Sequence, residues 1–354
     1  MITNLSLNDK TQELILETLK GTERLLQIAS GSDDVEIIVM TDACPAHNVK
    51  RMLDGHFTGT VTNVKNPKYP FIPIGTTVNV CGVTIFKLRH EISVEDFKSR
   101  VYSAMDQSPK PYTWNNFNRG NHFVSLMYCD GKTGYLENGQ YLVVHASSNE
   151  YRNKLYPNKG VWYEDQIKKV ILPDDPKRSL HYITGSTAEK FYSIAKNLLS
   201  FNQKRNSDFC EYVLKGIVDK EILNVQHYGM PDRNTICIGA QWETSGIVPL
   251  LTAPGQNIYL VKPRETTKYF PHGLGVEIYD GDIHYTKDGG ICIGKKVLYS
   301  NTSLSIGVDA FNRAEKTPLE ICISNILAKN PAKIVAELKQ IASISARGFE
   351  VWNG

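Results

Sequence analysis

The stretch Gly120-Asn-His-Phe-Val-Ser-Leu-Met-Tyr128 passes from turn residues into an apolar run, Phe123–Tyr128, and a second apolar run follows at Tyr141-Leu-Val-Val-His145. Short runs of β-branched and aromatic residues between turn signals are typical of strands buried inside a sheet. A histidine lies at one end of each run, His122 before the first and His145 at the close of the second. The two runs therefore predict buried strands that carry imidazole groups at their ends.

Further strands are expected on both sides of these two. Val35–Met40 is a short apolar run that leads into a loop at Asp42–His47. Gly55–Lys87 has a β-like pattern, in which glycines and prolines separate valines and isoleucines. Thr235–Ala240 and Ile258–Val261 are predicted as two more strands. Strands are thus expected through most of the chain.

Helices are predicted in four places. The apolar spacing over residues 7–29 indicates a helix, or a pair of helices broken near Gly21. A capping box predicts a helix over about Ser93–Met105, and a second predicts a stronger helix over about Ser186–Phe201. Near the end of the chain, an asparagine followed by proline predicts a helix over about Asn330–Ile341, with proline at its first position.

The order of these elements favours an α+β fold. Strands and helices do not alternate strictly enough for a doubly wound parallel sheet. No convincing linker interrupts the pattern, so residues 1–354 are expected to form one domain. Apolar residues make up 41% of the chain and charged residues 22%, as in ordinary globular proteins. The net charge of +3 permits an anionic substrate without requiring one.

The cysteines and the hydropathy of the chain indicate the cellular compartment in which the protein is expected. The seven cysteines are an odd number without the spacing of a disulfide framework, and no signal segment opens the chain. No run of about 18 apolar residues is present, which argues against a membrane span. We therefore expect a cytoplasmic protein without a membrane partner.

Five residues from distant parts of the chain are candidates for metal binding or nucleophilic chemistry: Cys81, His122, His145, His227 and His272. Taken alone, a buried histidine or cysteine is more often a packing residue than a ligand. Taken together, they offer the nitrogen and sulfur donors that a catalytic transition-metal centre needs. The set therefore predicts a metal site.

The candidates lie in motifs that follow one another in a fixed order between about residues 36 and 276. The motifs are Met40-Thr-Asp42 with Gly59-Thr-Val61, Ile74-Gly75 with Cys81-Gly-Val83, Gly120-Asn-His-Phe123, His145-Ala-Ser-Ser148, Gln226-His-Tyr228, Pro254-Gly-Gln256 and Pro271-His-Gly-Leu-Gly275. In this order the chain resembles the RtcB family of RNA-splicing ligases. The resemblance implies a single compact domain with packed β-sheets around a metal centre and helices at the periphery.

The resemblance also implies an activity and roles for individual residues. Members of the family use manganese, two ions in each protein, and GTP to join RNA 3′-phosphate or 2′,3′-cyclic phosphate ends to 5′-hydroxyl ends through a histidine–GMP intermediate. By this resemblance Cys81 is a thiolate bridging two metals, His122, His145 and His227 are further ligands, and His272 is the nucleophile. The nucleotide contacts implied are Asn121, Ser125, Pro254, Gly255, Gln256, Gly273, Gly275 and Asn353. A monomer with an accessory activating protein is expected.

The chain departs from the family pattern at charged positions. Val78 replaces an aspartate ligand, and Asn149, Ile238 and Val276 stand where the family has positive residues. A neutral side chain cannot replace the phosphate clamp of an arginine. The family residues that read guanine are replaced by Ser125 and Asn353, so the resemblance leaves the choice of nucleotide open.

These departures leave other functions open. A metal-dependent phosphoesterase needs the metal ligands without a nucleotide pocket. A non-catalytic protein that binds RNA ends on an inherited scaffold would bind in a salt-dependent manner and hold little manganese. In the plainest alternative, the histidines serve only packing in an α+β protein.

Overall fold

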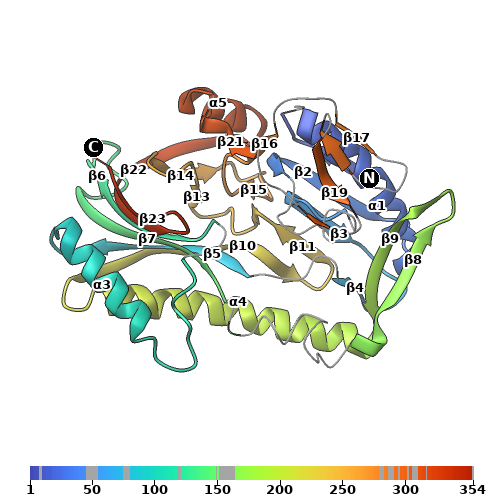
Figure 1. The fold of residues 1–354 in the computed structure, drawn as a ribbon, viewed down its shortest axis with the longest axis horizontal. Helices are drawn as coiled ribbons and strands as arrows, with labels where there is room; N and C mark the ends of the chain where they lie inside the picture. Colours follow the sequence, from blue (N-terminus) through green and yellow to red (C-terminus); the bar gives the residue numbers. More distant parts are fainter. Residues whose placement is uncertain are drawn as a thin grey trace.

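A large and mostly antiparallel sheet forms the central part of the molecule (Figure 1). The computed structural model describes residues 1–7, 10–44, 55–74, 80–117, 121–148, 150, 164–278, 283–285, 291–293, 296–300, 303–304, 310–315 and 317–352. The strands of the large sheet follow the order β1 (Ile2–Asn4), β2 (Val35–Cys44), β3 (Thr58–Val64), β11 (Thr235–Ile238), β10 (Val218–Asp232), β5 (Cys81–Leu88), β7 (Gly139–Ser147), β6 (Phe123–Cys129), β22 (Ala332–Ser345), β14 (Ile258–Pro263) and β13 (Val248–Leu250), and β23 (Gly348–Val351) pairs with β22. Among its described strands, only β1 and β2 pair in parallel.

Small sheets and four described α-helices surround the large sheet. The small sheets are β4 (Phe71–Pro73) with β9 (Asp175–Thr184) and β8 (Lys168–Leu172), β12 (Ala240–Gln241) with β15 (Phe270–Pro271), β16 (Val276–Ile278) with β21 (Ala310–Asn312), and β17 (Ile283–Tyr285) with β18 (Ile291–Ile293), β19 (Lys296–Ser300) and β20 (Ser303–Leu304). The helices are α1 (Lys10–Ser30), α3 (Val94–Asp106), α4 (Gly185–Val213) and α5 (Leu319–Lys329), and short 3-10 turns occur at Glu164–Gln166 and Arg313–Glu315. The predicted α+β class is confirmed.

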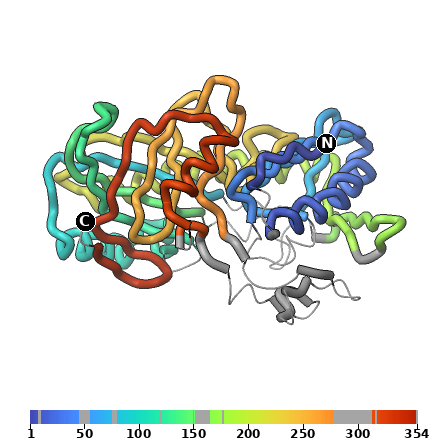
Figure 2. The backbone as a smooth tube through the Cα atoms, turned by 90° about the horizontal axis from the view of Figure 1, so that it is seen from above, coloured from blue at the N-terminus to red at the C-terminus, as the bar shows by residue number. Residues whose placement is uncertain are grey.

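The first and last strands lie far apart. Figure 2 shows β1 and β23 toward opposite ends of the molecule, and Figure 1 shows the same separation. Among the described residues, no helix combines the length and apolar character that a membrane span requires.

The centre of the sheet is buried on both faces, and this explains its continuous apolar runs. On β6 and β7, Val124 and Val144 pack in a cluster with residues of α3 and α4. Met127 and Val143 point to the other face and pack against β14 and β22. Because neither face meets water, the alternation of a half-exposed strand is missing. The predicted strands Phe123–Tyr128 and Tyr141–His145 are confirmed as the cores of β6 and β7.

The helix α1 passes through Gly21 without a break, so the first of the two expectations for residues 7–29, a single helix, is confirmed. An added Cβ at Gly21 would lie 2.8 Å from the Arg178 side chain, so the glycine leaves room for that side chain. A second helix differs in extent from the expectation. The helix α4 continues to Val213, well beyond Phe201. Beyond Phe201 the helix buries polar side chains, including Asn202, and these interrupt the apolar period by which a helix is recognised in sequence. By contrast, α3 begins as predicted, with Ser93 accepting a hydrogen bond from the Asp96 backbone.

The predicted helix at Asn330–Ile341 is wrong, because this segment forms the long strand β22. Asn330 is the C-cap of α5 instead of an N-cap, and a proline shortly after a helix end is common. Ala336 and Leu338 are buried between more exposed neighbours, which is the two-residue period of a strand. Pairing with β6 and β14 on its two sides outweighs the helix-favouring lysine, alanine and glutamate content.

The helix α4 packs across β10, β5 and β7 and holds a buried ion pair beneath them. The Arg205 side chain is fully buried, its Nε lies 2.7 Å from Glu150 Oε1, and it also donates to the Thr113 carbonyl at 2.7 Å. Glu150 accepts a second bond from the Thr113 backbone N–H. Arg205 thereby ties the segment after β7 to the segment before β6.

Removing this cation should destabilise the fold strongly. We expect Arg205→Met to lower the free energy of unfolding by about 3–5 kcal/mol, because it leaves Glu150 buried without its counter-charge. The matched change Lys204→Met removes a cation paired with Asp208 on the exposed side of the same helix, where a loss below about 1 kcal/mol is expected. Denaturant unfolding of both variants measures the difference, and equal losses would contradict this account.

Candidate metal centre

Four neighbouring strands bring the predicted ligands together. Cys81 is the first residue of β5, His145 lies near the end of β7, and His227 lies in β10, while His122 directly precedes β6. The antiparallel register places Val83 opposite His145, Tyr228 opposite Cys81, and Phe123 opposite His145. Residues that are far apart in sequence therefore meet at one end of β10, β5, β7 and β6.

The donor atoms lie close enough to share an ion. The Cys81 Sγ atom and one ring nitrogen each from His145 and His227 all lie within 4.8 Å of one another. The Nε2 atoms of His145 and His227 are 3.2 Å apart, and Cys81 Sγ is 3.4 Å from His122 Nε2. The rings of His122 and His145 are nearly perpendicular, with centroids 5.4 Å apart. The cluster of Cys81, His145 and His227 could hold a metal ion, with His122 beside it.

Backbone carbonyls fix the orientation of two of the rings. His145 Nδ1 donates to the Asn121 carbonyl at 2.9 Å, and His122 Nδ1 donates to the Asn116 carbonyl at 3.4 Å. A carbonyl can only accept, so the proton is on Nδ1 and the Nε2 lone pair is left for a ligand. This is the usual outer-shell arrangement of a metal-binding histidine. His227 differs, because its Nδ1 has no hydrogen-bond partner among the described residues.

Burial keeps the three imidazoles in the neutral form that binds metals. Burial, together with a smaller effect of the nearby Arg205 charge, lowers the pKa of His122 to about 4 against the opposing effect of the Asn116 carbonyl. Burial also lowers the pKa of His145 and of His227 well below the usual value, and neighbouring histidines add to the shift. At pH 7 these rings are therefore unprotonated.

The predicted nucleophile forms a buried pair with a carboxylate. His272 Nδ1 donates to Asp42 Oδ2 at 2.6 Å, and the same oxygen accepts from the backbone N–H groups of His272 and Gly273 at 3.2 and 3.3 Å. Asp42 is fully buried at the end of β2. The His272 ring stacks on His227 with centroids 4.8 Å apart. Asp42 therefore orients His272 beside the candidate ligands, with the proton on Nδ1 and the lone pair on Nε2.

Two glycines leave room for the His272 ring and for the backbone of Asp42. Gly239 has a φ of 68°, and an added Cβ would lie 2.9 Å from His272 Cε1. Gly275 has a φ of 74°, and its Cβ would lie 2.6 Å from the Asp42 carbonyl oxygen. The buried Arg313 side chain donates hydrogen bonds to the carbonyls of Thr41 and Leu274, and so links the end of β2 to the segment that follows His272. A side chain at either glycine would push His272 and Asp42 apart.

The predicted nucleotide contacts occupy several places. The Asn121 carbonyl supports His145, and the Gly273 N–H supports Asp42, so both contribute to the centre through the backbone. Ser125 is fully buried on β6, donates to Ser343 Oγ at 2.9 Å and accepts from Gln340 Nε2 at 3.0 Å.

The Pro254–Gln256 loop reaches the same strand, β22. The Gly255 N–H also binds the Gln340 side chain, while Gln256 donates to the Ala314 carbonyl. Three further positions that the resemblance singled out, Val78, Asn149 and Asn353, lie outside the described residues. The predicted ligands and the predicted nucleophile thus converge, whereas Ser125 and Gly255 are joined through the Gln340 side chain.

Asp42 is a residue of the candidate site for which the sequence analysis predicts no role. It was part of a recognised motif, but it was expected in a loop, and the structure places it inside β2. The available signal was a carboxylate directly following an apolar run. A buried carboxylate needs a hydrogen-bond donor or a positive charge beside it, and a histidine from another segment of the chain can supply either.

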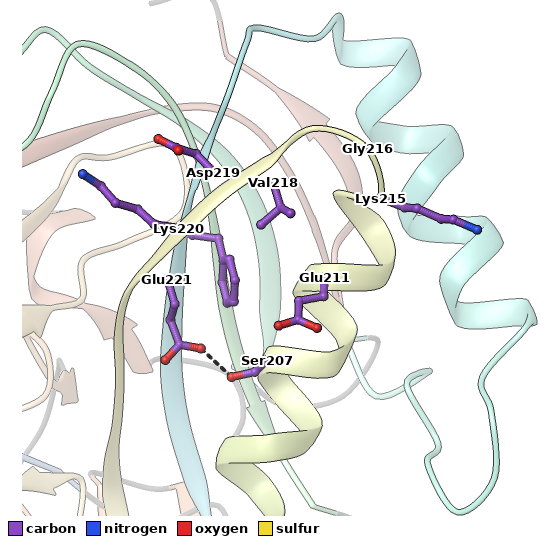
Figure 3. A pocket seen from close by; sticks show the side chains of 9 residues that line it. Ser207, Glu211, Lys215, Gly216, Val218, Asp219, Lys220 and Glu221 are labelled. Carbon is purple, nitrogen blue, oxygen red and sulfur yellow. Dashed lines mark hydrogen bonds between the residues drawn. The ribbon is translucent and has the colours of Figure 1, made fainter.

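A separate surface pocket of about 700 Å³ lies between the end of α4 and β10 (Figure 3). Glu211 and Lys215 line it from the helix side, and Glu221 lines it from the strand side, where it accepts a hydrogen bond from Ser207. Acidic and basic side chains alternate around it, so its charge selects no class of ligand. None of the predicted metal ligands lines this pocket.

No protein-family model matches this chain, and no curated protein matches it. The interpretation of the centre therefore rests on the positions of its side chains and on the order of its motifs.

Replacing a ligand should abolish tight metal binding. We expect His145→Ala and His227→Ala to weaken the affinity for a divalent transition metal by more than about tenfold, which is the loss typical of even an outer-shell partner. His90→Ala is the matched control, because His90 is exposed and lies outside the cluster. Metal analysis after equilibrium dialysis measures the effect. Equal metal content in all three variants would show that the cluster is not a binding site.

Proposed function

We propose that the protein is a metal-dependent nucleotidyltransferase that ligates RNA ends, with His272 as the nucleophile. The observation that carries this proposal is the 2.6 Å contact between His272 Nδ1 and Asp42, beside the cluster of Cys81, His145 and His227. A histidine oriented by a carboxylate next to a metal site suits covalent transfer of a nucleotidyl group. The motif order that resembles RNA-splicing ligases gives the substrate class.

The first step is an attack by His272 on a nucleotide co-substrate, GTP by resemblance. The Nε2 lone pair forms a bond to the α-phosphorus, the bond between that phosphorus and the bridging oxygen breaks, and pyrophosphate leaves. The imidazole keeps its proton on Nδ1 and becomes positively charged. Because Asp42 accepts that proton in a hydrogen bond, its negative charge stabilises the cation as it forms.

The later steps return His272 to its starting form. An oxygen of the RNA 3′-phosphate attacks the nucleotide phosphorus, and the bond to Nε2 breaks, which restores its lone pair. The 5′-hydroxyl of the second RNA end then attacks the activated 3′-phosphorus, loses its proton, and displaces GMP. A divalent ion at the cluster, manganese by resemblance, supplies charge neutralisation for the phosphate oxygens.

Labelling with nucleotide tests the proposal directly. We expect the wild type, incubated with a divalent metal and GTP or ATP labelled at the α-phosphate, to retain label on a denaturing gel. His272→Ala should lose it completely. Asp42→Asn should lower the labelling rate by roughly 10²–10³-fold, which is the loss seen when one transition-state partner is removed.

The control for this experiment is His90→Ala, an exposed site where no change is expected. Wild-type protein that binds metal but takes up no label from either nucleotide would overturn the proposal.

A metal-dependent phosphoesterase is the second candidate. Ile238 is a buried apolar side chain beside Gly239, and Ser125 uses its hydroxyl inside the protein, so these positions offer little for holding a nucleotide. Attack by water activated at the metal does not require His272.

The two candidates differ in their response to the loss of His272. If the protein is a phosphoesterase, hydrolysis of a 2′,3′-cyclic nucleotide should survive His272→Ala and fall to background in His227→Ala. Hydrolysis that is lost equally in both variants would exclude this alternative.

A further inference from the structure

The donor group at the centre consists of sulfur and nitrogen. Cys81, His145 and His227 contribute one thiol and two imidazoles, and the adjacent His122 contributes a third imidazole. No carboxylate belongs to this group among the described residues. Imidazole and thiolate select zinc and similar borderline ions, whereas manganese prefers carboxylate, carbonyl and water oxygens. The chemistry of the donors thus disagrees with a manganese centre.

The spacing of three donors is compatible with one ion. In tetrahedral zinc sites the metal is about 2.0–2.1 Å from nitrogen and about 2.3 Å from sulfur, so neighbouring donors are roughly 3.3–3.6 Å apart. The Nε2 atoms of His145 and His227, 3.2 Å apart, lie close to this spacing, and Cys81 Sγ lies within 4.8 Å of one ring nitrogen of each. In the metal-free protein the contact between the two histidines needs a bridging proton, which a shared cation would replace.

Among the described residues, Cys81, His145 and His227 form the one cluster of three or more thiol, imidazole or carboxylate donors that are close enough to share an ion. Asp42 Oδ2 accepts three hydrogen bonds from His272 and Gly273, and Asp42 Oδ1 has no hydrogen-bond partner among the described residues. Glu150 binds Arg205 through Oε1, and its Oε2 likewise has no such partner. Neither carboxylate belongs to the donor cluster, so the described residues supply one metal site.

We infer that the centre binds one ion of the zinc class through Cys81, His145 and His227, in place of two manganese ions, with the fourth position open to water or a phosphate oxygen. This inference rests on the metal dependence of the proposed function. It does not need the nucleotide step, so its test uses metals alone.

Cobalt is the probe, because it replaces zinc and reports its ligands. Metal-stripped wild-type protein titrated with Co²⁺ should develop the intense visible bands of tetrahedral cobalt and a thiolate-to-cobalt charge-transfer band, and both should saturate at one equivalent per chain. An equal concentration of Zn²⁺ should remove these bands, and Mn²⁺ should leave them unchanged.

Two variants distinguish the ligands. Cys81→Ser should lose the charge-transfer band, and His145→Ala, at a cobalt concentration that restores occupancy, should keep that band while the visible bands shift with the loss of one imidazole ligand. His90→Ala should match the wild type. If a ligand variant fails to fold, direct metal analysis of wild type dialysed against Zn²⁺ or Mn²⁺ still decides the question.

Two equivalents of bound manganese per chain, or a weak octahedral cobalt spectrum without a sulfur band, would overturn the inference. Failure of the proposed function has a different signature, which is the absence of nucleotide labelling in protein loaded with any of these metals.

Discussion

The antiparallel register of β10, β5, β7 and β6 is the constraint on which the centre depends. It sets Cys81, His145 and His227 at the same end of adjacent strands, so that no long loop has to fold back to bring them together. A slip of one residue would turn each side chain to the opposite face. Burial of both faces of the sheet specifies the register, and buried Arg205 holds the segments that flank His122 and His145.

The strands of the core and the convergence of the ligands could be predicted from the sequence. Continuous apolar runs identify β6 and β7, and the motif order pointed to Cys81, His122, His145, His227 and His272, which the structure brings together. The strand β22 was missed because its identity is decided by pairing with β6 and β14, partners that lie far away in sequence. The end of α4 was missed because Asn202 and Arg205 are buried by partners from other elements.

The chemistry combines two kinds of buried group with opposite needs. Burial keeps His122, His145 and His227 neutral, the form in which an imidazole can bind a metal, whereas Asp42 stays paired with His272 through the proton on Nδ1. The stacking of His272 on His227 places the His272 ring beside the candidate ligands. The Asp42–His272 contact could not be predicted from the sequence. The two residues lie far apart in the chain, and the packing of β2 against the loop that carries His272 brings them together.

X-ray absorption spectroscopy of the metal-loaded protein tests the central claim most directly, because it reports the atoms bound to the ion without reference to activity. The convergence of Cys81 and the histidines predicts one sulfur scatterer and the multiple-scattering pattern of imidazoles, with the sulfur lost in Cys81→Ser. A spectrum explained by oxygen ligands alone, and identical in the wild type and in Cys81→Ser, would contradict the account.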